Sequence, residues 1–426
     1  MEYYAKSKKV QFTSERINEI KKNMKNIEEC LKENLTETDV EILNSSITDI
    51  AEKTEEKQKT LKEHHKDIVT CAEMFFLEYG EYFTEKEKKL VVEACRIHDL
   101  GKVNLVFQAM ICPKLAEKFH IDVRKTSQIP HGFLSAVTIS LDEFDDLSEL
   151  FSDKDFGPFI TAVYYHHDRE DHYNSPAIRK YAEKYYMKQI EEYLNRKIRK
   201  LNCSNLDDLL FRNNVYTGKY IPDSNAWKEY LLIKGLLNKF DYTVSAGYEN
   251  AESAIDLHEK KLVKNIEKFL NGKELRPAQK FMKMNTDKNL IVIAPTGSGK
   301  TEASLLWMNG EKSFYTLPLK VSSNAIYLRI KENYEYKDVA LLHSDAMAVY
   351  LREYNGNEDI GEKYERSKML SQPLTVCTVD QLFRFVYRAL GTEIFAATLK
   401  YSKLVLDEIQ AYEPRVIATI IYGLKM

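Results

Sequence analysis

The sequence predicts a multidomain protein in which an all-α bundle is followed by an α/β domain with a parallel sheet. From residue 61 to about 248, apolar residues recur at intervals of three and four, as in "LVVEACRIHDLGKV" and "WKEYLLIKGLLNKFDYTVSAGY". This is the period of amphipathic helices. After about residue 270 the chain changes to short apolar runs separated by helical stretches. Strands that alternate with helices favour a parallel sheet covered on both faces.

These patterns divide the chain into a charged helical N-terminal extension (1–60), a helical domain (61–250), a helical linker (251–271) and an α/β domain (272–426). The extension contains "RINEIKKNMKNIEECLKENL" and is expected to be a solvated helical pair without chemistry. The expected strands of the α/β domain are "NLIVIAP", "SFYTLPL", "DVALLH", "LTVCTV" and "KLVLDE".

Composition excludes several classes of protein. The formal net charge is −3, so any nucleic-acid contact must come from a local patch. The 6 cysteines show no Cys-x-x-Cys pairing, which argues for reduced thiols in a cytosolic protein and against a zinc ribbon or a disulfide scaffold. The sequence contains no signal peptide and no run of about 18 apolar residues. We therefore expect a cytoplasmic protein without a membrane partner.

The helical domain contains histidines and aspartates whose order predicts a metal site. Each lies in an amphipathic segment that can aim one polar side chain inward, and a helical bundle can gather such side chains around one or two transition metals. A lone buried histidine is more often a core residue, and we assign that role to His65 and His172. The predicted ligands are His64, His98, Asp99, His131, His166, His167 and Asp241.

The stretch "RIHDLGK" (96–102) is the predicted centre of this site. Two metal ions about 3.5–4 Å apart activate a water and stabilise the leaving oxygen in phosphodiester hydrolysis. The carboxylate of Asp99 can bridge such a pair while the imidazole of His98 binds one ion. Lys102, one helical turn after His98, is expected to steady a phosphate by its charge. Asp99 and Lys102 are therefore the predicted catalytic residues of the helical domain.

The α/β domain contains a phosphate-binding loop. "APTGSGKT" (294–301) follows a β-like run and opens an amphipathic helix, which is the context that this motif requires. Its backbone N–H groups wrap the phosphates, Lys300 reaches the β- and γ-phosphates, and Thr301 ligates Mg²⁺. The predicted nucleotide-binding residues of the loop are Thr296, Gly297, Ser298, Gly299, Lys300 and Thr301.

A second nucleotide motif is "KLVLDEIQAYEP" (403–414). Its aliphatic run ends at Asp407, predicted to join the magnesium shell, and Glu408, predicted to contact the attacking water. Open α/β sheets bind ligands at the carboxyl ends of their strands. The sequence therefore predicts an ATP site with Mg²⁺, in which Glu408 is also catalytic.

The histidine and aspartate pattern resembles the HD superfamily of metal-dependent phosphohydrolases. The doublet "HH" and the upstream "LKEH" resemble the HD nuclease of CRISPR-associated nuclease–helicases. In "LRPAQ", Gln279 resembles the adenine-reading glutamine of superfamily-two helicases. "YTLPLKVSSNAIYLRI" (315–330) and "TVDQLF" (378–383) resemble their strand-gripping motifs, which implies that Thr378, Asp380 and Gln381 lie near a nucleic-acid path.

An HD nuclease followed by a RecA-like lobe resembles the nuclease–helicase of type I CRISPR systems, from about residue 60 to the end. The resemblance implies a two-metal DNA nuclease that prefers single strands and is recruited by a guide-RNA surveillance complex. The imidazole ligands make Mn, Fe, Co or Ni the candidate metals. It also implies a second helicase lobe, which the sequence lacks beyond Met426. We therefore expect weak ATP binding without translocation unless a separate polypeptide supplies that lobe. Gln410 stands where this family more often has histidine.

Two other functions remain open from the residues alone. HD proteins also include nucleotide phosphohydrolases, and the metal site could instead be structural in a non-catalytic nucleic-acid or partner-docking protein. The stretch "YAEKYYMKQIEEYLNRKIRK" (181–200) mixes tyrosines with basic residues, as single-strand binding surfaces do. We favour the alternative, a solvated helix with a stripe of core tyrosines.

Overall fold

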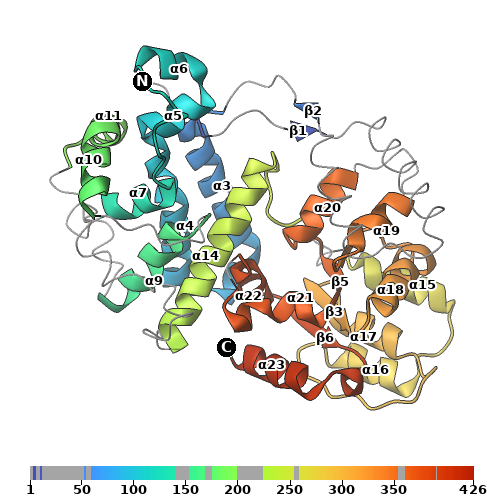
Figure 1. Ribbon diagram of the computed structural model, residues 1–426. Coiled ribbons are helices and arrows are strands. Elements are labelled where there is room, and N and C mark those ends of the chain that lie inside the picture. The colour runs from blue at the N-terminus through green and yellow to red at the C-terminus, as the bar shows by residue number, and fades with distance from the viewer. Residues whose placement is uncertain are drawn as a thin grey trace.

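The structure is a computed structural model that describes residues 3–5, 10–11, 52–53, 59–139, 153–167, 175–198, 224–253, 259–353, 360–389 and 391–426. A helical domain and an α/β domain lie side by side (Figure 1). The predicted fold class, an all-α bundle followed by a parallel-sheet α/β domain, is confirmed. His172 and most of residues 1–60 lie outside the described residues.

The helical domain is built around one long central helix. Helix α14 packs against α3, α4 and α9, and the side chains between them are apolar, such as Phe75, Leu90 and Phe240. Helices α3 and α4 each begin with a capping box, in which a threonine and the glutamate three residues later satisfy each other's free N–H groups. The helices are α3 (Leu61–Tyr79), α4 (Glu85–Ile97), α5 (Leu105–Ile111), α6 (Pro113–Lys118), α7 (His131–Thr138), α9 (Asp153–Tyr164), α10 (Ser175–Tyr185), α11 (Met187–Leu194) and α14 (Ser224–Ser245), with the 3₁₀ turns η1 (Gly80–Tyr82) and η2 (Leu100–Val103).

The N-terminal extension departs from the prediction at the few positions that the structure describes. Strands β1 (Val10–Gln11) and β2 (Glu52–Lys53) pair antiparallel, so these residues are not helical as predicted. Tyr3 is buried against the helical domain, and Tyr4 forms a bridge with Thr60. Helix propensity is a weak preference that tertiary pairing overrides.

The α/β domain has a parallel sheet with the strand order β4-β5-β3-β6. Four of the predicted apolar runs form its strands: β3 (Ser313–Leu317), β4 (Val339–Leu342), β5 (Leu374–Thr378) and β6 (Lys403–Leu406). The helices around the sheet are α15 (Lys261–Leu270), α16 (Pro277–Met284), α17 (Lys300–Met308), α18 (Lys320–Asn333), α19 (Ala346–Glu353), α20 (Ile360–Lys368), α21 (Val379–Leu382), α22 (Glu393–Leu399) and α23 (Pro414–Lys425), with the 3₁₀ turns η3 (Phe383–Tyr387) and η4 (Ile409–Ala411).

The fifth predicted strand, "NLIVIAP" (289–295), is wrong. These residues have no strand structure, and Ile291 and Ile293 are 95% and 97% exposed. An apolar run becomes a strand only when a neighbouring strand pairs with its backbone. Strand β6, at the edge of the described sheet, pairs with β3 alone.

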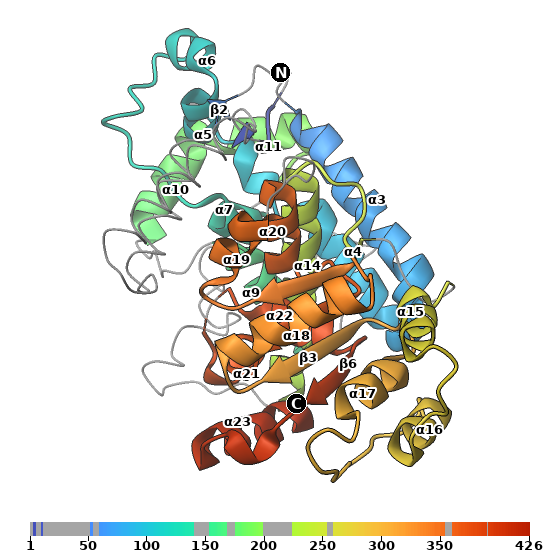
Figure 2. The ribbon, with the colours of Figure 1, turned by 90° about the vertical axis from the view of Figure 1, so that its right-hand side faces the viewer.

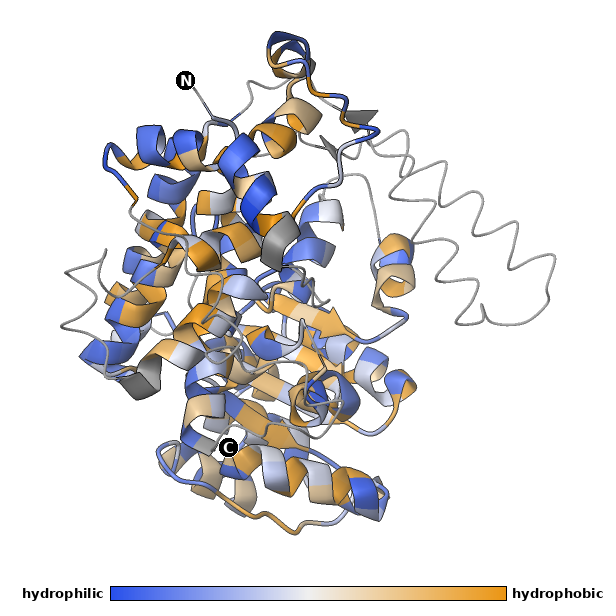
Figure 3. Cartoon of the chain, turned by 60° about the vertical axis from the view of Figure 1, so that its left-hand side comes forward, coloured by the Kyte–Doolittle hydropathy of each residue, from blue (hydrophilic) through white to orange (hydrophobic). Residues whose placement is uncertain are grey.

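The two faces of the sheet pack against different partners. Because side chains alternate along a strand, Phe314 and Cys377 face the core shared with the helical domain, whereas Tyr315 and Val376 face the core formed with α17 and α18. Figure 2 shows α18 in front of the sheet and α22 and α14 behind it. The helical domain therefore covers one face of the α/β sheet. Figure 3 shows hydrophobic residues along the strands and hydrophilic residues on outward helix faces.

The predicted helical linker includes α15, which packs on the α/β domain. Leu262, Val263 and Ile266 on this helix are buried in the same core as residues of α17. Within the described parts of the chain, no helix is both long enough and apolar enough to span a membrane.

Candidate metal centre and nucleotide site

The structure brings all the predicted metal ligands of the helical domain together from separate elements. His64 lies in the first turn of α3, His98 caps α4, and Asp99 precedes η2. The remaining ligands lie at the start of α7, just after α9 and in α14. These are His131, His166, His167 and Asp241. They form two groups, each with ligand atoms within 4.8 Å of one another.

The first group contains His64, His98, Asp99 and Asp241, all of them buried. His64 Nε2 lies 3.3 Å from Asp99 Oδ2 and 3.2 Å from Asp241 Oδ1. His98 Nε2 lies 3.4 Å from Asp99 Oδ2 and 4.0 Å from Asp241 Oδ1. Two imidazole nitrogens and two carboxylates thus converge on one point, which suits a transition metal.

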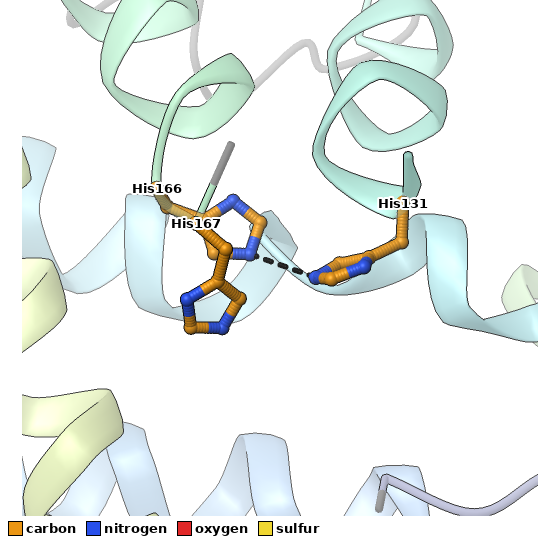
Figure 4. A group of neighbouring side chains, drawn as sticks. All are labelled: His131, His166 and His167. Carbon is orange, nitrogen blue, oxygen red and sulfur yellow. Dashed lines mark hydrogen bonds between the residues drawn. The ribbon is translucent and has the colours of Figure 1, made fainter. Parts of the chain in front are cut away.

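The second group contains His131, His166 and His167, which Figure 4 shows pointing toward one another. The Nε2 atoms of His131 and His166 are 3.2 Å apart. Both lie 3.4 Å from Asp99 Oδ1. His167 Nε2 lies 3.1 Å from Asp241 Oδ2. One oxygen of Asp99 therefore faces each group, which is the arrangement of a bridging carboxylate.

Backbone carbonyls orient two of the rings. His98 Nδ1 donates to Cys95 O at 3.1 Å, and His166 Nδ1 donates to Val163 O at 2.6 Å. In a neutral imidazole, donation from Nδ1 leaves Nε2 free to face the site as a metal ligand.

Gly101 of "HDLGK" brings two ligands together by close approach. A Cβ at this position would lie 2.0 Å from the carbonyl oxygen of His131. The Gly101 N–H also donates to Ser135 Oγ at 2.8 Å. This glycine therefore lets η2, which follows Asp99, touch α7, which begins with His131.

Both aspartates are held in the ionised state. Burial alone would raise the pKa of Asp99, but His98 and Lys102 outweigh it and hold that pKa well below its usual value of 3.8. Burial of Asp241 is likewise outweighed, first by the hydrogen bond from His167, and the pKa of Asp241 is well below 3.8. Ionised carboxylates are the form that ligates a cation.

The imidazoles of the candidate metal centre divide into two kinds. Burial lowers the pKa of His166 to about 4 and that of His131 well below 6.5, so both rings are neutral at neutral pH. For His64, burial is outweighed by the adjacent carboxylates of Asp241 and Asp99, which raise its pKa above 6.5. A cation that binds His64 must therefore displace a proton that the carboxylates favour.

Lys102 is buried and its Nζ lies 2.6 Å from Asp99 Oδ2. Burial opposes the ammonium charge, but Asp99 and Asp241 outweigh it and raise the pKa of Lys102. The ammonium group of Lys102 pairs with the carboxylate of Asp99, which faces both groups. A phosphate that contacts Lys102 would therefore compete with Asp99 for this ammonium group.

The donor set fits transition metals. His64 Nε2, His98 Nε2 and Asp99 Oδ1 are buried and make no well-directed hydrogen bond to the described residues. Buried polar atoms are costly without a partner, and cations bound at the two groups would satisfy all of them. His65 lies outside both groups, and its Nδ1 is 3.1 Å from the hydroxyl of Tyr193.

The phosphate-binding loop precedes α17, which begins at Lys300. Gly297 and Gly299 have φ angles of 76° and 84°, which suit a loop that turns its N–H groups inward. Lys300 Nζ donates to Ala294 O at 3.2 Å and lies 3.6 Å from Glu408. Gln279 is buried and donates to Gly299 O at 3.3 Å, so the predicted adenine-reading residue contacts the loop.

Asp407 follows β6 at the carboxyl edge of the sheet, as predicted. Its Oδ2 accepts a hydrogen bond of 2.6 Å from Tyr315, and its Oδ1 accepts one of 2.9 Å from the Glu408 N–H. Sequence reasoning missed Tyr315, because a tyrosine inside a buried strand carries no signal of its own. The side chain of Gln410 donates to Glu408.

Two family matches cover most of this architecture. Residues 51–225 match the family described as Cas3, HD domain, and residues 276–422 match the DEAD/DEAH box helicase family. The chain joins a Cas3 HD domain to a DEAD/DEAH box helicase domain. The predicted resemblance is thereby confirmed. Asp241 lies on α14, beyond the part of the Cas3 HD domain that the match covers.

Relatives extend this result to nearly the whole chain. The chain is 24% identical over 440 residues to the CRISPR-associated nuclease/helicase Cas3 of Methanothermobacter thermautotrophicus, covering 88% of this chain and 51% of that protein. The crystal structure of T. fusca Cas3 matches with a TM-score of 0.56, at 17% identity, over 87% of this chain and 47% of that one. The T. fusca Cas3-ATP structure matches with a TM-score of 0.54, at 18% identity and the same coverage, 87% and 47%. The chain thus spans about half the length of these Cas3 proteins.

Residues that the sequence linked to a nucleic-acid path differ in exposure. In the helicase domain, Thr378 is buried at the end of β5, whereas Asp380 is exposed and accepts a hydrogen bond from Gln381 at 2.9 Å.

In the Cas3 HD domain, Tyr181 and Tyr186 are buried. Within residues 181–198, the described part of the Tyr-rich stretch, these tyrosines therefore belong to a core stripe, as favoured from the sequence.

Proposed function

We propose that this chain is a metal-dependent DNA nuclease joined to an ATP-binding helicase lobe. The observation that carries the proposal is the position of Asp99, whose two carboxylate oxygens lie near separate pairs of imidazole nitrogens. The likeness to the CRISPR-associated nuclease/helicase Cas3 supports a role in CRISPR defence. We propose single-stranded DNA as the substrate and a guide-RNA surveillance complex as the recruiting partner.

Two divalent transition metal ions, such as Mn, Fe, Co or Ni, fit the site. When bound, such a pair would supply an activated water and charge neutralisation for phosphodiester hydrolysis. The first ion would be held by His64, His98 and Asp241, and the second by His131, His166 and His167, with Asp99 between them. The neutral rings of His131 and His166 are ready to ligate without losing a proton.

Neighbouring groups of the protein orient the metal ligands and balance their charge. Carbonyls of Cys95 and Val163 fix the rings of His98 and His166, so the site is ordered before a cation arrives. Lys102 balances part of the negative charge of the two aspartates, and we assign it the contact with a phosphate next to Asp99.

We propose that the helicase lobe binds ATP with Mg²⁺ at residues 296–301. Lys300 and Thr301 stand at the N-terminus of α17, where N–H groups favour phosphate. Asp407 and Glu408 follow the end of β6, and we assign the reading of adenine to Gln279, which contacts the loop. The likeness to the T. fusca Cas3-ATP structure supports the nucleotide assigned to this lobe.

The decisive experiment is cleavage of end-labelled single-stranded DNA without ATP, in Mn, Fe, Co, Ni, Zn and Mg. Wild-type chain is compared with a double variant, His98→Ala/Asp99→Ala, and with His120→Ala, which changes an exposed histidine. We expect cleavage that requires a transition metal, is abolished in the double variant and persists in His120→Ala. Cleavage by the double variant, or hydrolysis of deoxynucleoside triphosphates with intact DNA, would contradict the proposal.

A further inference from the structure

Helix α14 contributes to both domains. Asp241 on this helix belongs to the metal centre. Lys239 precedes it by two residues, so the two side chains leave the helix about 200° apart. Lys239 contacts the helicase domain, and α14 packs on α22 as well as on α3, α4 and α9 (Figure 1). This one helix therefore carries both a residue of the metal centre and a contact with the helicase domain.

The ammonium group of Lys239 is fully buried between the domains. Its Nζ lies 2.8 Å from Glu252 Oε1 and donates to the carbonyls of Met369 at 2.8 Å and Leu370 at 3.1 Å. These carbonyls belong to the loop between α20 and β5. A buried cation is stable only beside its acceptors, so Lys239 ties α14 to that loop.

A second lysine shares the same acceptors. Lys312, just before β3, is buried with Nζ 2.5 Å from Glu252 Oε2 and 2.7 Å from the carbonyl oxygen of Gln372. It also donates to Leu370 O, and Tyr401 donates to Glu252 Oε1 at 2.7 Å. Two ammonium groups thus share one carboxylate. We call Lys239, Glu252 and Lys312 the interface cluster.

The backbone around the interface cluster is tightly constrained. Leu370 has a φ of 56°, a left-handed conformation that is strained for leucine. Its carbonyl oxygen accepts from both lysines. A Cβ at Gly235 on α14 would lie 2.4 Å from the carbonyl oxygen of Glu393 on α22. Closely packed contacts of this kind have low compressibility, so a displacement of residues 369–372 or α22 would be transmitted to α14.

We propose that Lys239 is a positioning residue of the nuclease site. By holding α14 in one rotation against residues 369–372, it keeps the Asp241 carboxylate between His64 and His167. A change in the helicase domain that moves this loop would reach the metal centre through α14. The inference rests on the metal-dependent nuclease proposed above.

The test compares Lys239→Met with Lys312→Met in the full chain. Each variant removes one ammonium group and leaves one lysine to balance Glu252, but only Lys239 lies on α14. We expect Lys239→Met to weaken Mn²⁺ binding, measured by calorimetry, about tenfold, as loss of a supporting contact does at other metal sites. The Mn²⁺ affinity of Lys312→Met is expected to stay within about twofold of that of the wild type, because Lys312 does not lie on the helix that carries Asp241.

Wild-type affinity in Lys239→Met, or an equal loss in both variants, would overturn the inference while leaving the proposed function intact. Absence of binding of Mn²⁺, Fe²⁺, Co²⁺ and Ni²⁺ by the wild type would overturn both. Hydrogen exchange in the wild type tests the coupling even if Lys239→Met does not fold. Mn²⁺ should slow exchange in residues 369–372 as well as around His64. Protection confined to the HD domain would refute the coupling.

Discussion

The hydroxyl of Tyr315 on β3 donates a hydrogen bond of 2.6 Å to Asp407, which directly follows the neighbouring strand β6. Burial raises the pKa of Tyr315, so its hydroxyl stays protonated and remains a donor. Because the second oxygen of Asp407 accepts from the Glu408 N–H, the carboxylate is held in one orientation from two sides. This carboxylate is the proposed magnesium contact of the nucleotide site.

Tyr315→Phe should reduce the contribution of Mg²⁺ to ATP affinity about three- to tenfold, because a freed carboxylate orients its cation less well. Binding of a fluorescent ATP analogue with and without Mg²⁺ measures this contribution. Tyr327→Phe is the matched control, since that hydroxyl hydrogen-bonds to Glu353 on another helix. An unchanged Mg²⁺ dependence in Tyr315→Phe would show that the hydrogen bond has no role in orienting Asp407.

Asp99→Asn keeps the shape of the side chain and removes the charge that faces both histidine groups. We expect the chain to lose at least one bound transition metal ion and to lose DNA cleavage, because the bridging ligand is gone. Metal content by mass spectrometry after dialysis is the measurement. Asp67→Asn, at a partly exposed aspartate that pairs with Lys59, serves as the control. Full metal content in Asp99→Asn would rule out a bridging role.

Gly101→Ala should destabilise the HD domain by about 2–4 kcal/mol, because the new methyl group would collide with the backbone of His131 and no flexible side chain can yield. Thermal unfolding followed by circular dichroism gives the difference. Gly80→Ala is the control, since its Cβ would meet only the flexible end of Lys88, at 3.2 Å or more. Equal melting temperatures for the two variants would mean that η2 and α7 can separate without cost.

Transition metal should stabilise the folded chain. A cation that binds only the native site at about 100 times its dissociation constant adds about 2.7 kcal/mol to the free energy of unfolding. The melting temperature should therefore rise with Mn²⁺ and fall back when a chelator is added. In His98→Ala/Asp99→Ala the rise should vanish. An equal rise in that variant would point to surface sites instead.

Stability should also fall in mild acid through His343 in the helicase domain. Burial lowers the pKa of this histidine from 6.5 to about 4, although Asp345 opposes the shift. Between those values the unfolded chain binds a proton that the folded chain does not, so stability decreases as pH falls from 6.5 toward 4. Melting temperatures at pH 7 and pH 5 should differ less in His343→Gln than in wild type. An identical difference would assign the acid sensitivity to other groups.

The sequence alone determined the fold class and the chemical types at both sites. Helical and strand periodicities come from local spacing, and four of the five predicted strands formed where their apolar runs lie. His64 and Asp241 could be selected although they are far apart in the chain, because each lies in an amphipathic segment and the order of the whole histidine and aspartate set resembles the HD superfamily. The phosphate-binding loop before Lys300 could be predicted from sequence, because a backbone that wraps phosphates requires glycines and a lysine at fixed spacing.

Only the tertiary structure decided how these groups meet. That one oxygen of Asp99 faces each histidine group depends on five chain segments packing together, and no local pattern encodes such packing. Residues 289–295 lack a strand because no described strand pairs with their backbone, whatever the apolar content of the run. Lys239, Glu252 and Tyr315 looked like ordinary residues in a helix, a charged linker and a buried strand. Their contacts arise from the way the two domains and the two neighbouring strands come together.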